Sequence, residues 1–279
     1  MTYVLFDIGG TKTRVALSED LETLSKVESF KTPLKFEDGI KKMIETIEGM
    51  NPGKVEAMAG GVRGRLNEEK TGIDKEIVLT KWAGKSIVDA FKKKYKVPIF
   101  IENDAAAAGV GEAVYGAGIG AEIVAYHTIS TGVGGVKIER GYIDDYSIGF
   151  EPGHQILDVD RTILGDDITP TLENLVSGAA VESRFGVKPY EIPQSDLLWN
   201  ELAEYLSQGL RNTILYWSPD VVVLGGSMII GDPRIEIDVV RKCVVEALDS
   251  FVECPFITIA KLGDEAGLYG GMGILKQRL

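Results

Sequence analysis

Hydrophobic and polar positions follow two periods along this chain, and the period predicts the type of each element. Short apolar or alternating runs that end at turn residues predict strands, whereas apolar residues three or four positions apart predict one-sided helices. The predicted strands are 3–6, 11–17, 55–59, 97–101, 122–129, 136–139, 221–224 and 256–260. The predicted helices are 36–50, 85–95, one starting at 105–108, 172–177, 201–217, 237–248 and 266–276. Because helices and strands are interspersed, the pattern predicts an α/β layered fold.

The stretch from Asp7 to Arg14 contains the first candidate site, because Gly9 and Gly10 join the first two predicted strands. Glycine accepts positive φ without penalty and has no Cβ, so a bulky anion can approach the main chain of such a turn. Turn amides, threonine hydroxyls and basic side chains are suitable donors for phosphate. The donors here are Thr11, Lys12, Thr13 and Arg14. Asp7, at the end of its strand, is suited to hold Mg²⁺ through water. The alternative is an ordinary hairpin with a Gly-Gly turn.

One later turn repeats this arrangement, and a third glycine-rich segment follows another strand. Thr131 and Gly132 lie in a glycine-rich turn between the strands predicted at 122–129 and 136–139. The recurrence of strand, turn and strand indicates a weak internal repeat and two related halves, which would hold phosphates from both sides. Gly225 and Gly226 follow another apolar strand, and a flat adenine ring would fit against a turn without side chains.

A possible acid–base residue follows the strand at 97–101. Asn103 or Asp104 is placed to cap the alanine-rich helix that comes next. Asp104 is either a cap alone or a carboxylate that faces the same cleft as Asp7 and accepts a proton from a substrate hydroxyl. The glycine-rich segment 60–64 is interpreted as a loop after the strand at 55–59, where α/β sheets bind ligands.

The segment 149–154 has the composition of a shaped ligand loop, with Glu151 and His154 beside a proline and a glycine. The other histidine, His127, lies in an apolar strand and is interpreted as structural. Glu173 lies on the helix predicted at 172–177. No structure is predicted for 158–167.

Composition narrows the function further. The 279 residues suggest one large or two medium domains, and 44% hydrophobic residues are ample for their cores. A net charge of -12 argues against a nucleic-acid surface, which needs a basic patch. Two cysteines, Cys243 and Cys254, form neither a disulfide framework nor a metal motif. Without a signal-peptide pattern or an apolar run of membrane-spanning length, a cytoplasmic protein is expected.

Several of these segments, in this order, resemble motifs of the ROK family of sugar kinases and repressors, within the actin, hexokinase and heat-shock chaperone superfamily. The matching segments are 7–12, 102–107, 130–135, 151–154, 224–227 and 262–268. The resemblance, closest to glucokinase-like members, implies an α/β fold of two RNase-H-like (actin-like ATPase) domains with a cleft between them. We expect residues 1–107 with 266–279 in the first domain and 108–265 in the second.

The resemblance also implies an ATP-dependent sugar kinase that phosphorylates a hydroxyl of glucose or of a related hexose or N-acetylhexosamine. Asp104 would be the general base, Mg²⁺ would accompany ATP near Asp7, and no nucleic acid or membrane would be bound. The sequence does not decide whether the protein forms a homodimer. The expected sugar-binding residues are Gly64, Asn103, Asp104, Glu151, His154 and Glu173. The expected ATP-binding residues are Asp7, Gly9, Gly10, Thr11, Lys12, Arg14, Thr131, Gly132, Gly225 and Gly226.

Departures from the family pattern bear on the substrate. Many members carry a zinc-binding cysteine cluster after the Glu-x-Gly-His loop, but 155–173 has no cysteine, so no zinc is predicted. Arg63 stands where the family usually has proline, and the usual Asn-Leu before a tryptophan is absent before Trp82. Both changes are expected to affect the choice of sugar and not the reaction.

Sequence features distinguish three other functions from a sugar kinase. A sugar-responsive regulator of the same family carries a helix-turn-helix before the first motif, and the motif here begins at Asp7. A sugar-independent actin-like ATPase would differ in that its ATP turnover needs no sugar. A dinucleotide oxidoreductase is disfavoured because Gly109 and Gly111 fall inside a predicted helix, not at a strand-to-helix turn.

Overall fold

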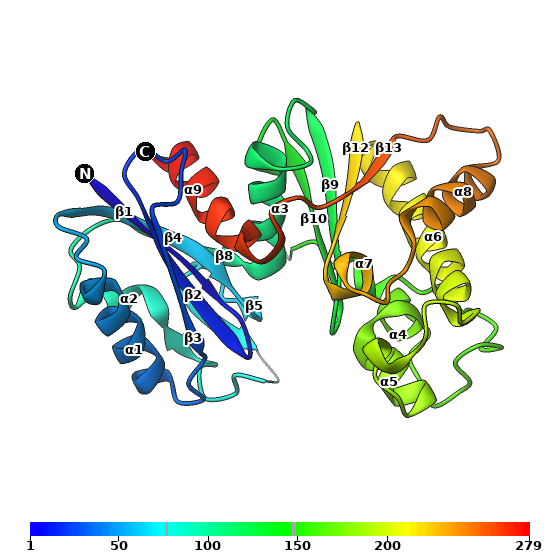
Figure 1. The fold of residues 1–279 in the computed structure, drawn as a ribbon, viewed down its shortest axis with the longest axis horizontal. Coiled ribbons are helices and arrows are strands. Elements are labelled where there is room, and N and C mark those ends of the chain that lie inside the picture. The colour runs from blue at the N-terminus through cyan, green and yellow to red at the C-terminus, as the bar shows by residue number, and fades with distance from the viewer. Residues whose placement is uncertain (76–77, 145, 147–148) are drawn as a thin grey trace. The chain divides into compact units, whose positions relative to one another are not determined.

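The computed structural model describes residues 1–75, 78–144, 146 and 149–279. The chain forms two compact units, one of Met1–Tyr115 with Asp264–Leu279 and one of Gly116–Gly263. The domains expected from the sequence were 1–107 with 266–279, and 108–265. The whole of helix α3 (Asp104–Tyr115) lies in the first unit, because it packs along the C-terminal helix α9 (Ala266–Arg278) (Figure 1).

A five-stranded sheet in the order β3-β2-β1-β4-β8 is the centre of the first unit. The first three strands are antiparallel neighbours, and β1, β4 and β8 run parallel. The strands are β1 (Thr2–Ile8), β2 (Lys12–Ser18), β3 (Lys26–Lys31), β4 (Val55–Val62) and β8 (Ile99–Asn103). Helices α1 (Phe36–Gly49) and α2 (Ile87–Lys92) cover one face, and α3 and α9 cover the other (Figure 1).

Alternation along β1 divides its side chains between the two faces. Val4, Phe6 and Ile8 belong to the core that the sheet forms with α1 and α2. Leu5 and Asp7 point the other way, toward glycines of α9. A Cβ on Gly267 would lie 3.0 Å from Asp7 Cγ, so the missing side chain brings this helix close to the carboxylate. The glycines of the C-terminal helix thus allow it to pack closely on this face of the sheet.

Three local predictions for this unit were wrong. Gly60 and Gly61 continue strand β4 and are not part of a loop, because their backbones pair with β1 and β8 on either side. Strand β3 was missed because it is an exposed edge strand without apolar alternation. The helix expected at 85–95 begins only at Ile87. The two residues before it form β7 (Lys85–Ser86), a strand of a small sheet with β5 (Arg65–Leu66) and β6 (Gly72–Lys75).

The second unit repeats the topology of the first, as the two glycine-rich turns predicted. Its sheet has the order β11-β10-β9-β12-β13, with an antiparallel hairpin β9–β10 and parallel pairs β9–β12 and β12–β13. The strands are β9 (Ile123–Ile129), β10 (Val133–Glu139), β11 (Tyr142–Ile143), β12 (Val221–Gly225) and β13 (Phe256–Ile259).

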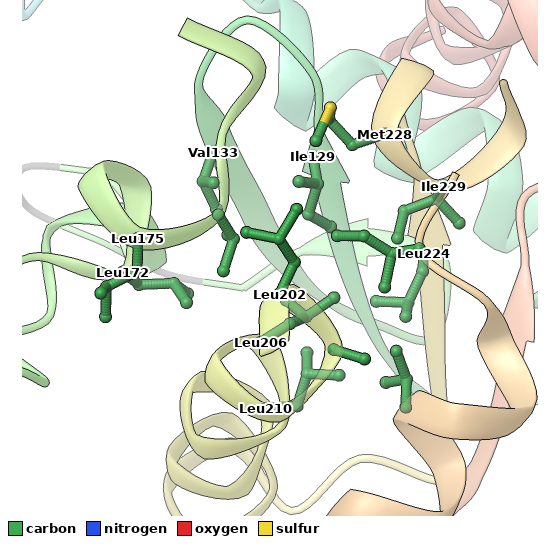
Figure 2. Close-up of a cluster of buried hydrophobic side chains, with 14 of the residues drawn as sticks. Ile129, Val133, Leu172, Leu175, Leu202, Leu206, Leu210, Leu224, Met228 and Ile229 are labelled. Carbon is green, nitrogen blue, oxygen red and sulfur yellow. The ribbon is translucent and has the colours of Figure 1, made fainter. Parts of the chain in front are cut away.

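Leucines of the long helix α6 fill the core of this unit against the sheet and against α4 (Figure 2). Leu202, Leu206 and Leu210 recur at the helical spacing that the sequence predicted. The helices are α4 (Leu172–Val176), α5 (Gly178–Phe185), α6 (Leu198–Trp217), α7 (Ser227–Ile230) and α8 (Ile237–Leu248). Short 3₁₀ turns lie at Pro152–His154 and Pro189–Glu191 here, and at Gly263–Glu265 where the units meet in sequence. Helices α5 and α7 were missed. Among the described residues, no helix is long and apolar enough to cross a membrane.

His127 is fully buried in strand β9, where its Nε2 lies 3.0 Å from the hydroxyl of Thr213 and its ring stacks on Trp217. Its Nδ1 has no hydrogen-bond partner among the residues described. Burial lowers the pKa of His127 to about 4, because the charged imidazolium would lose its hydration. The structural role predicted for this histidine agrees with these contacts.

We expect this burial to make the second unit acid-sensitive. Between about pH 6.5 and 4 the unfolded chain binds a proton at His127 that the folded chain does not, so stability is full above that range and falls as pH decreases. From pH 7 to 5 the loss is about 2 kcal/mol. Urea unfolding should show that His127→Gln has a shallower pH dependence than the wild type. His154→Gln, at an exposed histidine, is the control and should keep the wild-type dependence.

Candidate active site

The carboxyl ends of the parallel strands bring Asp7 and Asp104 together in the first unit. Asp7 pairs with Gly61 across β1 and β4, and Gly61 pairs with Glu102 across β4 and β8. A Cβ on Gly61 would lie 3.7 Å from Asp7 Oδ1 and 3.2 Å from Asp104 Cα. Gly61 therefore lies between the two aspartates, and its missing side chain allows both of them to lie close to it.

The surroundings of Asp7 shift the pKa of its carboxyl group upward. Burial raises its pKa to about 6, and the negative charge of Asp104 acts in the same direction. Arg14 opposes both effects through an ion pair, with Nη1 at 3.2 Å from Asp7 Oδ2. The same guanidinium also binds Asp264, which precedes α9. Arg14 thus lies between two carboxylates.

Asn103 caps the N-terminus of α3 at the junction between β8 and this helix. Asn103 Oδ1 accepts the amide hydrogens of Ala105 at 3.0 Å and Ala106 at 3.4 Å, so Asn103 takes the capping role. Its Nδ2 donates to the carbonyl of Gly64 at 3.2 Å, which joins two of the predicted sugar residues. Gly64 has φ +103°, a conformation that favours glycine.

An ion pair that the sequence analysis did not identify supports the same junction. Glu102 is buried, 5% exposed, and Lys70 Nζ lies 2.5 Å from its Oε1. Lys70 comes from the connection between β5 and β6, so the small sheet is tied to the residue just before Asn103. A buried carboxylate needs such a partner, because an unpaired charge there would be costly.

Hydrogen bonds within the hairpin and from Thr32 hold the first glycine-rich turn in place. The amide of Gly9 donates to the carbonyl of Lys12 at 3.0 Å, which closes the hairpin. Thr32 donates its hydroxyl hydrogen to the carbonyl of Gly9 at 2.7 Å and contacts the buried hydroxyl of Thr13. Thr13 is therefore a structural contact, whereas Thr11 and Lys12 are exposed.

In the second unit, the turns after β9 and β12 lie side by side, because those strands are parallel neighbours. The hydroxyls of Ser130 and Ser227 are 3.0 Å apart and link the two turns. Gly226 has φ +87°, and a Cβ there would lie 2.3 Å from the carbonyl oxygen of Ile129. Only glycine fits this position, so the predicted adenosine turn is packed directly on the predicted phosphate turn.

Glu173 also reaches the second phosphate turn. Its Oε2 accepts the amide hydrogen of Val133 at 2.8 Å and would lie 2.5 Å from a Cβ on Gly132. Helix α4 places Glu173 in its first turn after Thr171, whose hydroxyl caps the helix. The predicted sugar residue Glu173 and the predicted phosphate residue Gly132 are thus in direct contact.

The predicted ligand loop packs against the same strand. Pro152 and Gly153 are buried, and a Cβ on Gly153 would lie 2.3 Å from the carbonyl oxygen of Val133. Glu151 and His154, on either side of this pair, are exposed. The loop and Glu173 therefore both meet β10 at Val133, immediately after the phosphate turn.

The segment after the ligand loop is organised by Asp158, which is 2% exposed. Its carboxylate accepts the amide hydrogens of Ile163 at 3.2 Å and Leu164 at 2.7 Å. The ends of the segment are joined where Ile156 pairs with Thr171. Backbone donors around a buried carboxylate thus order the region for which no structure was predicted. In the part of the chain described, no group of three or more His, Cys, Asp or Glu side chains is arranged to hold a metal.

Each unit brings a different set of predicted residues together. The first unit gathers Asp7, Arg14, Gly64, Asn103 and Asp104 at one edge of its sheet. The second gathers its two glycine turns with Glu173 and the ligand loop. Three residues that lie beside the candidate sites were not identified from the sequence: Lys70, Asp264 and Ser227. Asp264 and Ser227 fall inside recognised motifs, which was the available signal, but Lys70 had none.

This pair of related α/β units, each with a glycine-rich turn after its central strand, defines the actin-like ATPase fold. The model of the family described as "ROK family" matches residues 3–278, so the chain belongs to the ROK family.

Relatives cover nearly the whole chain. A glucokinase of Thermotoga maritima is 26% identical and matches 98% of this chain and 96% of its own length. A fructokinase of Lactococcus lactis subsp. cremoris is also 26% identical, over 91% of this chain and 87% of its own. The solved structure of a ROK hexokinase from Thermus thermophilus superposes with a TM-score of 0.83 at 26% identity, covering 100% of this chain and 99% of that one. The expected family and the α/β class with RNase-H-like units are confirmed.

Proposed function

We propose that this protein transfers the γ-phosphoryl group of ATP to a hydroxyl of a hexose or N-acetylhexosamine, with Asp104 as the general base. The observation that carries the proposal is the position of Asp104, at the start of α3 and near Asp7, at the carboxyl ends of the parallel strands on either side of β4. Membership of a family whose relatives are named glucokinase and fructokinase supports the reaction class.

In the proposed reaction, the bond from the γ-phosphorus to the bridging oxygen of ADP breaks while a bond to the sugar oxygen forms. Asp104 accepts the hydroxyl proton, which typically contributes about 10²- to 10⁴-fold in rate. Phosphoryl transfer depends mostly on positioning and charge neutralisation, and glycine-rich turns suit that role because their amides are accessible.

The residues present fit a magnesium ion that arrives with ATP. Hard carboxylate oxygens suit Mg²⁺, which keeps several waters and needs only one or two protein carboxylates. Asp7 has such an oxygen, and burial, which raises its pKa to about 6, favours a cation beside its charged form. When bound, Mg²⁺ would neutralise phosphate charge. Asp7 would hold and orient its water shell.

The remaining residues are proposed in two groups. Gly64, Asn103 and Asp104 in the first unit, with Glu151, His154 and Glu173 in the second, would contact the sugar. Gly9, Gly10, Thr11, Lys12, Arg14, Thr131 and Gly132 would contact phosphate, and Gly225 with Gly226 would contact adenosine. Their grouping at the carboxyl edges of β1, β4, β8, β9 and β12 supports this division, because ligands of α/β sheets bind at such edges.

The test is ADP formation in a coupled assay with a panel of hexoses and N-acetylhexosamines. We expect ATP turnover to depend on one or more of these sugars and the product to be a sugar phosphate. Turnover that proceeds equally without any sugar would instead identify a sugar-independent actin-like ATPase. Binding of a sugar without any turnover would identify a regulator.

A further inference from the structure

Gln155, directly after the ligand loop, makes three hydrogen bonds with its side-chain amide. Its Nε2 donates to the carbonyl of Pro152 at 2.8 Å and to the carbonyl of Gly209, on α6, at 3.4 Å. Its Oε1 accepts a hydrogen bond from Asn212 Nδ2, also on α6, at 2.7 Å. Because two carbonyl oxygens require a donor, the nitrogen of the Gln155 amide must face them and its oxygen must face Asn212. The amide therefore has one orientation, and it ties the ligand loop to α6.

The backbone of Gln155 holds a second element of the candidate sugar site. Its carbonyl accepts the amide hydrogen of Leu172 at 3.0 Å. Leu172 is the first residue of α4, and Glu173 follows it. Gln155 thus joins the ligand loop, which carries two of the three sugar residues expected in this unit, to the helix that carries the third.

Helix α6 has room for this amide because it carries a glycine there. A Cβ on Gly209 would lie 3.2 Å from Gln155 Nε2 and 2.5 Å from Leu172 Cδ2, so a side chain at this position would press on both. The other end of the loop packs on the same helix. The ring of Phe150 meets the ring of Trp217 edge-on, with centroids 5.3 Å apart. Helix α6 therefore holds the ligand loop at both ends.

We propose that Gln155 and Asn212 are positioning residues for the sugar, an inference that rests on the proposed function. Gln155 fixes the loop from which Glu151 and His154 reach the sugar, and it fixes the start of the helix that carries Glu173. Asn212 acts through Gln155, because it donates to the oxygen of that amide. A loop that is ordered before the sugar arrives binds it more tightly, since less conformational freedom is lost on binding.

A purely structural role for these hydrogen bonds predicts different behaviour. Hydrogen bonds that only stabilise the fold lower the midpoint of unfolding and leave the affinity of the folded protein for sugar unchanged. Residues that position a sugar-binding loop instead raise KM for the sugar and leave kcat nearly unchanged, because the loop holds the substrate and the transition state alike. The split between KM and kcat therefore distinguishes the two roles.

The kinetic test compares Gln155→Met and Asn212→Leu with the wild type in the sugar-dependent ADP assay. Methionine is similar in length to glutamine but cannot donate a hydrogen bond, and leucine favours helix more than asparagine does, so α6 itself is not weakened. We expect KM for the sugar to rise by at least about tenfold in Gln155→Met and about fivefold in Asn212→Leu, with kcat within about threefold. The double variant should be within about twofold of Gln155→Met, because Asn212 acts through Gln155.

Two exposed residues of the same helix give matched controls. Gln208→Met and Asn200→Leu make the same exchanges at exposed positions of α6 and should keep the wild-type KM for the sugar. Urea unfolding of each variant shows whether it is folded. If Gln155→Met does not fold, Asn212→Leu gives the same comparison, because it removes one of the three hydrogen bonds and leaves the other two.

A spectroscopic measurement separates this inference from the proposed function. The chain has two histidines, so the imidazole NMR signals of His154 are identified by their loss in His154→Gln. In the full chain without sugar or nucleotide, Asn212→Leu should shift and broaden these signals, because the loop that carries His154 exchanges between conformations once the amide of Gln155 is released. Asn200→Leu should leave them as in the wild type.

Three results would overturn the inference: unchanged His154 signals in Asn212→Leu, a lower kcat with an unchanged KM for the sugar, or additive effects in the double variant. A wild type that neither phosphorylates nor binds a sugar would overturn the proposed function. The His154 signals would still decide in that case whether the amide pair holds the loop.

Discussion

Asp104→Asn is expected to abolish most of the sugar-dependent turnover, with kcat lower by about 10²- to 10⁴-fold. Asparagine is nearly the same size, and its oxygen can still accept the amide hydrogen of Ala105, as Asp104 Oδ1 does at 2.9 Å. The cap from Asn103 is untouched. The variant loses the negative charge of Asp104 and with it the ability to take a proton.

Stability should not fall with activity in this variant. The charge of Asp104 raises the pKa of Asp7, which means that it disfavours the ionised form of Asp7 in the folded protein. Removing that charge relieves the repulsion, so the free energy of unfolding at pH 7 should be unchanged or higher. Inactivity with an intact unfolding transition therefore points to chemistry and not to misfolding.

The matched control for this substitution is Asp89→Asn. Asp89 is also an aspartate in the first turn of a helix, but it is exposed on α2. Coupled ADP assays on both variants, with and without sugar, give the comparison. If Asp104→Asn retains near wild-type turnover while it remains folded, Asp104 is not the base.

Gly270→Ala is expected to destabilise the first unit by about 3 kcal/mol, at the upper end of the usual cost of overpacking. A Cβ on Gly270 would lie 1.8 Å from the carbonyl oxygen of Ala107, and the obstacle is backbone that no rotamer change can move. At the same helix crossing, a Cβ on Gly111 would lie 2.3 Å from the carbonyl oxygen of Ala266. Helices α3 and α9 would have to separate.

The separation would also reach the candidate site, because α3 begins at Asp104 and α9 begins beside Asp7. We therefore expect a lower midpoint of urea unfolding together with weakened activity. Gly49→Ala is the control, because a Cβ at the end of α1 would meet nothing within 4 Å. That variant should be neutral or stabilised by up to about 1 kcal/mol, as alanine favours helix. A Gly270→Ala protein with wild-type unfolding would show that the helices are not held so closely.

Elements with a buried face were predictable from the sequence. Helix α8 has the bounds that its apolar spacing predicted, and α1 differs by one residue at its end. Strand β3 was not predictable, because it pairs with β2 at the edge of the sheet and nearly all of its residues are exposed. Gly60 and Gly61 show the converse error. Glycine suggests a turn locally, but two neighbouring strands impose an extended backbone.

The sequence by itself determined the repeated strand–turn–strand device, the amphipathic helices and the chemistry available at Asp7 and Asp104, because these depend on residue type and local spacing. Only the tertiary structure decided which partners those groups meet. Arg14 is paired with an aspartate 250 residues away, Glu173 is bound to the amide of Val133, and Gln155 binds the carbonyl of Gly209. Such contacts follow from strand register and helix packing, which bring distant segments within bonding distance and which no local pattern encodes.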